Sequence, residues 1–373
     1  MRERIGILTG GGDCPGLNTV IRAVVKCATK HGWETIGFLE GFEGLLEPVR
    51  YRRLDYKEMD ALLFVGGTIL GTSNKGRFAA KTGHGETHRI PRDILRRAKA
   101  NIQQLGLRAL VVVGGDGSLT TAQQLFEQGV PIIGVPKTID NDLAATALTF
   151  GFDSAVACAT DALDRLRTTA QSHDRVMVLE VMGRYAGWIA ITAGISGGGD
   201  VILIPEIPFH LERVCAKIIE REREGKRFTL VVVAEGAREQ GADFVTAGGA
   251  EASREARLGG IGAVVAAGIQ KRTGKETRVC VLGHLQRGGA PTSCPCFAAW
   301  RAGDGGGSAR YSWCGCCGPS RRCRWRCGRP ILRRPSPIPG RSGSRWTQPT
   351  TSHSIMMRSP ARASDTLPIL DRS

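Results

Sequence analysis

Short runs of apolar, often β-branched residues recur along the chain and alternate with longer stretches in which apolar residues repeat with a helical period. The short runs predict strands at 5–8, 109–113, 132–135, 176–180, 201–204, 230–233 and 279–282. The longer stretches predict helices, most clearly at 17–30, 93–104, 154–170 and 211–223. Strands that alternate with helices form buried, mostly parallel sheets, so we expect an α/β fold. A chain of 373 residues is long enough to bury two such cores.

The last part of the chain, from about residue 293, breaks this pattern. Residues 294–373 contain no Val, Lys or Glu, and only eight of them are Ile, Leu or Phe. So small an aliphatic content is typical of segments that cannot bury a core, and we expect a disordered tail. Its bias toward Arg, Gly, Pro, Ser, Cys and Trp favours a GC-rich coding sequence translated out of frame; a genuine disordered tail is the alternative. A zinc module is a third interpretation, but its spacings differ from the usual C-x2-C pairs. Its ligands would be Cys314, Cys316, Cys323 and Cys327.

Most of the formal net charge of +16 also lies in this tail, which holds 14 Arg and three acidic residues. The first 293 residues carry a surplus of only five positive charges, so the charge gives little support for nucleic-acid binding. No segment is apolar enough to cross a membrane, and the run 5–8 is too short for a signal peptide. Unpaired cysteine spacing is typical of reduced thiols in a cytoplasmic enzyme. These cysteines are Cys14, Cys27, Cys158, Cys215 and Cys280.

Three loops, each following a predicted strand, carry the candidate chemistry. The first, GGGDCPGLN at 10–18, continues into a predicted helix, whose N-terminal amides could bind phosphate while the glycines allow close approach. It lacks the GK[ST] of a P-loop, and Pro15 stands where a dinucleotide fingerprint has glycine. A tight strand-to-helix turn explains these glycines nearly as well.

The second and third loops add carboxylates. GGDGS at 114–118 places Asp116 among glycines, which suits a Mg²⁺ ion that bridges to phosphates; a helix cap is the structural alternative. PKTIDND at 136–142 places Asp140 close to Asp142, and their repulsion is costly unless a metal, an arginine or proton transfer uses it. Taken alone, this third loop favours a plain turn.

Together and in this order, the three loops resemble the phosphofructokinase family. Further matches are DRVMVLEVMGRYAG at 174–187, AEG at 234–236 and LGHLQRGG at 282–289, and the resemblance covers residues 1 to about 292. It implies a Mg²⁺-dependent transfer of the γ-phosphoryl group of ATP to the 1-hydroxyl of fructose 6-phosphate, giving fructose 1,6-bisphosphate in glycolysis. It also implies a cytoplasmic homotetramer or homodimer with no nucleic-acid or membrane partner.

The resemblance assigns roles to single residues. Asp140 is expected to be the general base, with Thr138 beside the transferring phosphoryl group and Arg184 neutralising its charge. Asp116 would hold Mg²⁺, supported by Asp142. The nucleotide is expected to contact Gly11, Gly115, Asp116, Gly117, Ser118 and Lys75. The sugar phosphate is expected to contact Thr138, Ile139, Asp140, Arg175, Met182, Gly183, Arg184, Glu235, Arg278, His284, Leu285, Gln286 and Arg287.

Guanidinium groups suit a dianionic phosphate, although each arginine taken singly is more typical of an exposed surface charge. By the resemblance, Arg175 and Arg278 would reach the sugar phosphate of a partner subunit. The chain departs from the family at Asn74, where an arginine usually helps to bind the transferring phosphate. Lys75 or Arg77 could take that role.

The phosphoryl donor is expected to be ATP, because Gly117 leaves room for an α-phosphate where pyrophosphate-using relatives carry aspartate. Lys137 favours pyrophosphate instead, so a pyrophosphate-dependent transferase is the first alternative. An inactive nucleotide-binding remnant, caused by the altered tail and Asn74, is the second. We expect a nucleotide-binding domain of residues 1–151 plus 253–292, a sugar-phosphate-binding domain of residues 152–252, and an active site between them.

Overall fold

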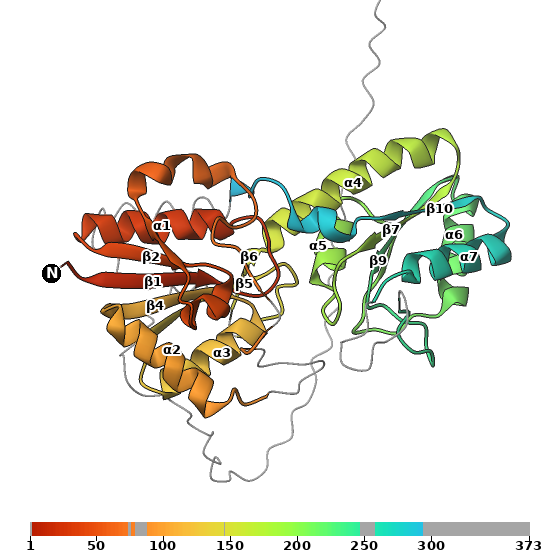
Figure 1. The fold of residues 1–373 in the computed structure, drawn as a ribbon. Helices are drawn as coiled ribbons and strands as arrows, with labels where there is room; N and C mark the ends of the chain where they lie inside the picture. Colours follow the sequence, from red (N-terminus) through yellow and green to blue (C-terminus); the bar gives the residue numbers. More distant parts are fainter. Residues whose placement is uncertain (1, 74–75, 79–87, 145, 247–257, 294–373) are drawn as a thin grey trace, which may run out of the picture. The chain divides into compact units, whose positions relative to one another are not determined.

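The computed structural model describes residues 2–73, 76–78, 88–144, 146–246 and 258–293 (Figure 1). All described elements belong to one unit, Met1–Trp325. The second unit, Arg326–Ser373, lies outside the described residues, as do the four candidate zinc ligands of the tail. The described part contains two mostly parallel sheets with helices on both faces, which confirms the expected α/β fold.

The first sheet has six strands in the order β3-β2-β1-β4-β5-β6. Its strands are β1 Arg4–Thr9, β2 Glu34–Phe38, β3 Tyr51–Leu54, β4 Leu107–Gly114, β5 Ile132–Thr138 and β6 Phe150–Gly151. The associated helices are α1 Leu17–Lys30, η1 Gly41–Leu45, η2 Tyr56–Glu58, η3 Asp60–Phe64, α2 Arg92–Gln104 and α3 Asp116–Glu127. The strands pair in parallel except for β2 and β3. The carboxyl ends of β1, β4 and β5 therefore meet at one edge of the sheet.

Alternate side chains of these strands pack into two different clusters. Ile7 and Val113 pack with Val20 of α1, whereas Leu8 and Val112 pack with residues of α2 and α3. Figure 1 shows α1 on one face of this sheet and α2 and α3 on the other. A strand covered on both faces needs a continuous apolar run, and this explains why β1 and β4 were predictable from sequence.

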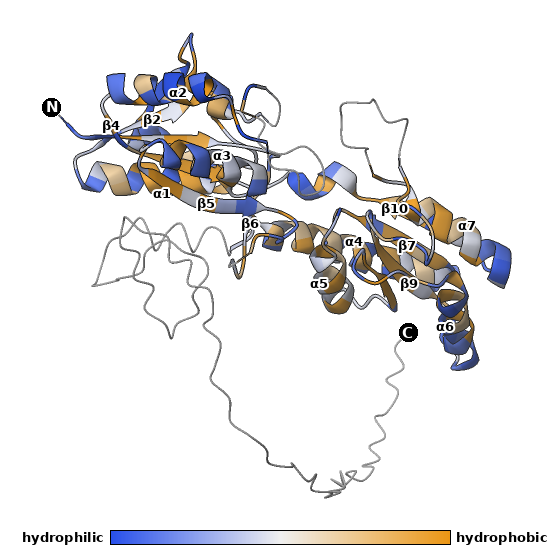
Figure 2. Ribbon diagram, turned by 90° about the horizontal axis from the view of Figure 1, so that it is seen from below, coloured by the Kyte–Doolittle hydropathy of each residue, from blue (hydrophilic) through white to orange (hydrophobic). Residues whose placement is uncertain are grey.

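The second sheet has four parallel strands in the order β10-β7-β9-β8. Its strands are β7 Val176–Val181, β8 Val201–Leu203, β9 Thr229–Ala234 and β10 Thr277–Val281. Its helices are α4 Phe152–Ser172, α5 Trp188–Ser196, α6 Leu211–Arg223, α7 Ile261–Thr273 and η4 Gly283–Arg287. Helices α6 and α7 pack on one face, and α4 and α5 on the other. Figure 2 shows apolar residues on the strands and hydrophilic residues on the outer surfaces of α2 and α6.

The structure differs from the sequence expectation at β10. This strand was assigned with the first domain, but it pairs along its whole length with β7, from Thr277 opposite Val176 to Val281 opposite Glu180. Helix α7 packs on the same sheet. The apolar run at 279–282 predicts a strand, but which neighbour a strand pairs with depends on tertiary contacts that the run does not encode. Residues 261–281 therefore belong with the second sheet.

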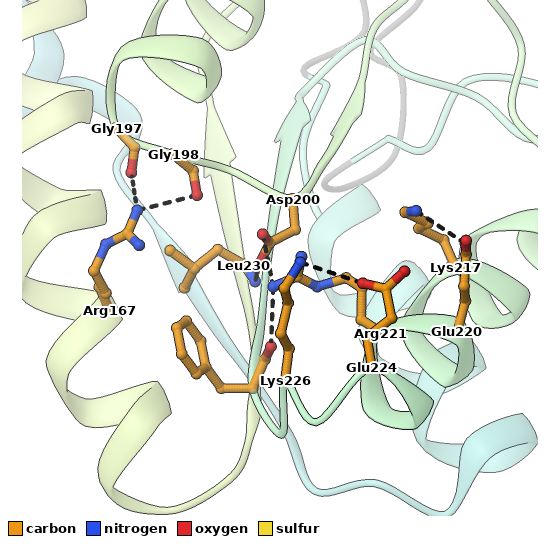
Figure 3. Close-up of polar contacts among 11 residues, drawn as sticks. Arg167, Gly197, Gly198, Asp200, Lys217, Glu220, Arg221, Glu224, Lys226 and Leu230 are labelled. Atoms are coloured by element: carbon orange, nitrogen blue, oxygen red, sulfur yellow. Dashed lines mark hydrogen bonds and ion pairs between the residues drawn. The ribbon is translucent and has the colours of Figure 1, made fainter. Parts of the chain in front are cut away.

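A largely buried ion pair joins the residue before β8 to the last turn of α6 (Figure 3). Asp200 Oδ1 lies 2.8 Å from Arg221 Nη2, and the two side chains are 15% and 12% exposed. Asp200 Oδ2 also accepts a hydrogen bond from the Leu230 amide at 2.8 Å. The pair Lys217–Glu220 in the same helix is largely exposed.

We expect Asp200→Ala to lower the free energy of unfolding by about 3 kcal/mol, because it leaves the Arg221 charge buried without its carboxylate. Urea unfolding followed by circular dichroism measures this difference. Glu220→Ala breaks the exposed pair with Lys217 and is the matched control, with no expected shift in the unfolding midpoint. Equal midpoint shifts in the two variants would contradict the prediction.

Candidate active site

Two glycine loops lie against each other at the carboxyl edge of the first sheet. The Gly10 amide donates to Val113 O at 2.8 Å, and Gly16 and Gly115 cap the N-termini of α1 and α3. Ser118 fills the space between the loops: a Cβ on Gly10 would lie 2.5 Å from its Oγ, and one on Gly114 would lie 2.7 Å from the same atom. Two helix N-termini and two glycine loops at one edge form an arrangement suited to phosphate groups.

The third loop follows β5, the neighbour of β4, and thus lies beside the second. Lys137 is 3% exposed, and its Nζ donates to the carbonyl of Gly12 in the first loop. Burial lowers the pKa of this ammonium group. A Cβ on Gly115 would lie 3.2 Å from Lys137 O. All three loops that the sequence singled out therefore meet, with one buried cation among them.

Asp140, in the third loop, is a carboxyl group whose pKa is strongly shifted. Its amide donates to Thr138 Oγ1 at 3.2 Å. Burial, with the charge of Asp142 as a second cause, raises the pKa of its carboxyl group from 3.8 to about 6, while Arg287, Lys137 and Arg184 act in the opposite direction. A carboxyl group with such a pKa can accept a proton near neutral pH.

The loops after β7 and β9 lie close to each other. The Gly236 amide donates to Gly183 O at 3.2 Å. The Arg184 guanidinium lies 5.3 Å from the centre of the Tyr185 ring, and its Nε donates to the Tyr185 hydroxyl at 3.0 Å. Burial, followed by the charges of Asp140 and Glu180, raises the pKa of Glu235 from 4.5 to about 7. The charge of Asp140 thus acts on Glu235, which follows a strand of the other sheet.

Arg287 brings the loop after β10 onto the first glycine loop. Its Nη1 donates to Asp13 O at 3.1 Å, and a Cβ on Gly12 would lie 2.8 Å from the same nitrogen. His284 and Leu285, on the same 3-10 helix, are exposed. Arg287 itself is partly buried.

Two residues predicted to contact sugar phosphate have their side chains in the core. Ile139 and Gln286 are fully buried. Gln286 Oε1 accepts from the Met182 amide at 2.7 Å, and its Nε2 donates to Ala155 O at 3.5 Å. Gln286 therefore supports the loop that carries Met182, Gly183 and Arg184. This supporting role of Gln286 can be identified only from the structure, because the sequence does not show whether a glutamine is exposed or buried.

Arg175 and Arg278 lie at the opposite end of the second sheet. Arg175 immediately precedes β7 and Arg278 is the second residue of β10, whereas Met182 and Glu235 follow the carboxyl ends of β7 and β9. Six residues of strand separate the two ends of β7, a span of about 20 Å. Glu276 binds both arginines. Within one chain, the structure does not bring these two arginines to the other predicted sugar-phosphate residues.

The remaining predicted residues are placed as follows. Asp116, Gly117 and Ser118 form the first turn of α3, and Asp142 is exposed. Asn74 and Lys75 lie outside the described residues. Arg77, the other candidate to replace the missing arginine, is bound by Glu43, whose Oε2 lies 2.8 Å from its Nη2 and 3.0 Å from its Nε.

The sequence did not reveal two polar residues that organise the loops. Asn18 is 1% exposed, and its Oδ1 accepts from the Ile69 amide at 2.8 Å, while its Nδ2 donates to the carbonyls of Val65 and Gly66. An asparagine on the apolar face of a predicted helix is a signal that could have identified it. The second, Asn141, has a left-handed backbone with φ 52°.

No group of three or more His, Cys, Asp or Glu side chains suited to a metal ion is present among the described residues. Mg²⁺ commonly uses one or two carboxylates, with phosphate oxygens and water completing its coordination. The separate carboxylates Asp116 and Asp142 fit that pattern. None of the described helices has the length and apolar character needed to span a membrane.

Comparisons with known proteins agree with these features. The family model for phosphofructokinase matches residues 4–304. The ATP-dependent 6-phosphofructokinase of Chloroflexus aurantiacus is 56% identical over 291 residues, 78% of this chain and 79% of the relative. The pyrophosphate–fructose 6-phosphate 1-phosphotransferase of Amycolatopsis methanolica is 48% identical over 302 residues, 80% of this chain and 85% of the relative.

The fold is also found in solved structures. Phosphofructokinase from Saccharomyces cerevisiae superposes with a TM-score of 0.67 at 30% sequence identity, covering 81% of this chain and 41% of that one. The sequence motifs, the two sheets and these similarities agree. The chain belongs to the phosphofructokinase family.

Proposed function

We propose that this chain transfers the γ-phosphoryl group of ATP to the 1-hydroxyl of fructose 6-phosphate. The observation that carries this proposal is the position of Asp140, a half-buried carboxyl group with a pKa of about 6, on which the charges of Arg287, Lys137 and Arg184 act. It lies where two glycine loops suited to phosphate meet the loops that hold Arg184 and Arg287. The relatives named ATP-dependent 6-phosphofructokinase support the choice of donor and acceptor.

In the proposed reaction, Asp140 accepts the proton of the sugar 1-hydroxyl as the hydroxyl oxygen attacks the γ-phosphorus. Arg184 stabilises the negative charge on the transferring group as the bond from the γ-phosphorus to ADP breaks and ADP leaves, which is the main catalytic requirement of phosphoryl transfer. Asp116 and Asp142 would hold Mg²⁺. When bound, this ion neutralises charge on the nucleotide phosphates. A cytoplasmic location stays a prediction.

We propose that the elements of the first sheet bind the nucleotide and that those of the second sheet, residues 261–281 included, bind the sugar phosphate. Glu235, His284 and Arg287 would contact the sugar phosphate within the chain. Arg175 and Arg278, which lie at the far end of the second sheet, would serve the site of a partner subunit. The proposed enzyme is therefore a homodimer or a homotetramer.

An assay that couples fructose 1,6-bisphosphate formation to NADH oxidation, with ATP and with pyrophosphate as donors, tests this proposal. A higher kcat/KM with ATP is expected. A higher kcat/KM with pyrophosphate would favour the second candidate, a pyrophosphate-dependent transferase. Two observations support this candidate: the buried Lys137 and the 48% identical pyrophosphate-dependent relative. No turnover with either donor would leave a nucleotide-binding protein without this activity.

The donor preference is expected to respond to Gly117→Asp. Gly117 lies in the first turn of α3, where an added carboxylate stabilises the helix through its dipole but repels an α-phosphate. We expect kcat/KM for ATP to fall at least about tenfold, with a smaller change for pyrophosphate. Gly117→Asn, which has nearly the size and shape of aspartate but no charge, is the control. Equal losses in the two variants would show a steric effect and contradict the electrostatic reason.

A further inference from the structure

Asn141, between the two carboxylates of the third loop, has a backbone conformation that few residues adopt. Its φ of 52° is left-handed, a region in which asparagine is tolerated better than most residues other than glycine. The residue thus turns the chain sharply between Asp140 and Asp142. Such a turn directly beside a proposed general base needs a structural partner to hold it.

That partner is the segment just before β6. Asn141 Oδ1 accepts hydrogen bonds from the Thr149 amide at 2.9 Å and from Thr149 Oγ1 at 3.2 Å. Asn141 Nδ2 donates to Ala147 O at 3.3 Å. The side chain of Asn141 therefore uses both ends of its amide group to bind the returning chain.

Thr149 completes the connection from the other side. It is 3% exposed, and its Oγ1 lies 2.6 Å from Thr138 O. Its single hydroxyl hydrogen is shared between this carbonyl and the more distant Asn141 Oδ1. Thr138 Oγ1 in turn accepts from the Asp140 amide. One buried threonine thus contacts the residue before the Ile139–Asp140 pair and the residue after it, so the backbone of Asp140 is held from both sides.

We propose that Asn141 and Thr149 are positioning residues for Asp140: their hydrogen bonds fix the loop so that the carboxylate meets the sugar hydroxyl in the reactive geometry. This inference rests on the proposed function. Neither side chain needs to touch a substrate in this role. Displacement of a reacting group by about 1 Å can cost about 10²-fold in rate, so loss of these bonds should reduce kcat more than it weakens substrate binding.

Three variants separate the contributions. Asn141→Gly keeps access to the left-handed backbone conformation but removes the side-chain carboxamide group. Thr149→Val removes the hydroxyl group with little change of shape, and Thr149→Ser restores it. Thr273→Val is the matched control, because Thr273 Oγ1 also makes two backbone hydrogen bonds, to Ile269 O and from the Lys275 amide, at the end of α7.

We expect Asn141→Gly and Thr149→Val to lower kcat at least about tenfold, with KM for both substrates within about threefold of the parent. Thr149→Ser should recover most of kcat, and Thr273→Val should leave it unchanged. Parent-like kcat in folded Asn141→Gly and Thr149→Val, or parallel changes in kcat, KM and melting temperature, would overturn the inference while leaving the proposed function intact.

Amide hydrogen exchange gives a readout that does not depend on turnover. In the full-length parent, the Thr149 amide should exchange at least about tenfold more slowly than the amide of the exposed Leu148, and Asn141→Gly should remove that protection. If the parent lacks activity with both donors, the proposed function fails and this measurement alone decides the hydrogen-bond connection. An unprotected Thr149 amide in the parent, or unchanged protection in Asn141→Gly, would overturn it.

Discussion

Replacing Asp140 by asparagine is expected to lower kcat at least about 10²-fold while leaving KM for fructose 6-phosphate within about threefold. The amide has nearly the size of the carboxyl group and can still be a hydrogen-bonding neighbour, but it cannot accept the proton of the attacking hydroxyl. Steady-state kinetics with ATP as donor measures both constants. Asp161→Asn, at an exposed site on α4, is the control and should retain the parent kcat.

The pH–rate profile of the parent enzyme should report the ionisation of the Asp140 carboxyl group. Because the pKa of Asp140 in the free enzyme is raised to about 6, its base form is lost as the pH falls below about 6, and log(kcat/KM) should then decrease by about one for each pH unit. The acid limb should be absent from the residual activity of Asp140→Asn. A parent profile that is flat from pH 7 to pH 5 would contradict the assignment of Asp140 as the base.

Thermal unfolding of Asp140→Asn distinguishes a loss of activity from a loss of structure. The folded pKa of Asp140 lies above its unfolded value of 3.8, so its contribution to stability is fully present below about pH 3.8 and is lost as the pH rises through about 6. At pH 7 the half-buried carboxylate of Asp140 therefore opposes folding. Asp140→Asn removes that charge and should unfold at the same temperature as the parent or higher. A lower melting temperature at pH 7 would indicate a structural role.

The second large effect is expected for Gly236→Ala, in the loop after β9. A Cβ at this position would overlap the carbonyl oxygen of Arg184 and lie 2.7 Å from its carbonyl carbon and 3.1 Å from Gly183 O. These are backbone atoms, which cannot rotate away as a flexible side chain could. The loop that carries Arg184 must therefore shift, and we expect kcat to fall at least about 10²-fold.

The comparison variant is Gly288→Ala, whose added Cβ would have its nearest neighbour, Leu285 O, at 4.0 Å. It should keep kcat within a few-fold of the parent, although it follows Arg287 directly. Circular dichroism and size-exclusion chromatography confirm that each variant is folded before kinetics are compared. Full activity in folded Gly236→Ala would mean that the positions of Arg184 and Gly183 are not critical.

Features that depend on local pattern were predictable from the sequence. Helices α1 and α6 begin and end at the predicted residues, and the apolar runs of β1, β4 and β9 became strands because helices cover both faces of their sheets. The three loops that the sequence singled out meet because parallel neighbouring strands bring their carboxyl ends to one edge.

Features that depend on tertiary partners were not predictable. The apolar run that forms β10 does not indicate which of the two sheets the strand joins. In the structure it pairs with β7 and so belongs to the second sheet. Gln286 was identified by its motif alone, and only the packing shows that its amide faces the Met182 backbone rather than solvent. Asn141 looked like an ordinary turn residue because its bonds to Thr149 join positions eight residues apart.

The contact of Ser118 with Gly10 and Gly114 also has an evolutionary consequence. A side chain at either glycine would occupy the space of the serine hydroxymethyl group, so substitutions at these three positions cannot be independent. Either glycine can acquire a side chain only after position 118 becomes smaller or the two loops move apart. Among descendants of this sequence, positions 10, 114 and 118 should therefore covary, and single changes at the glycines should be rare.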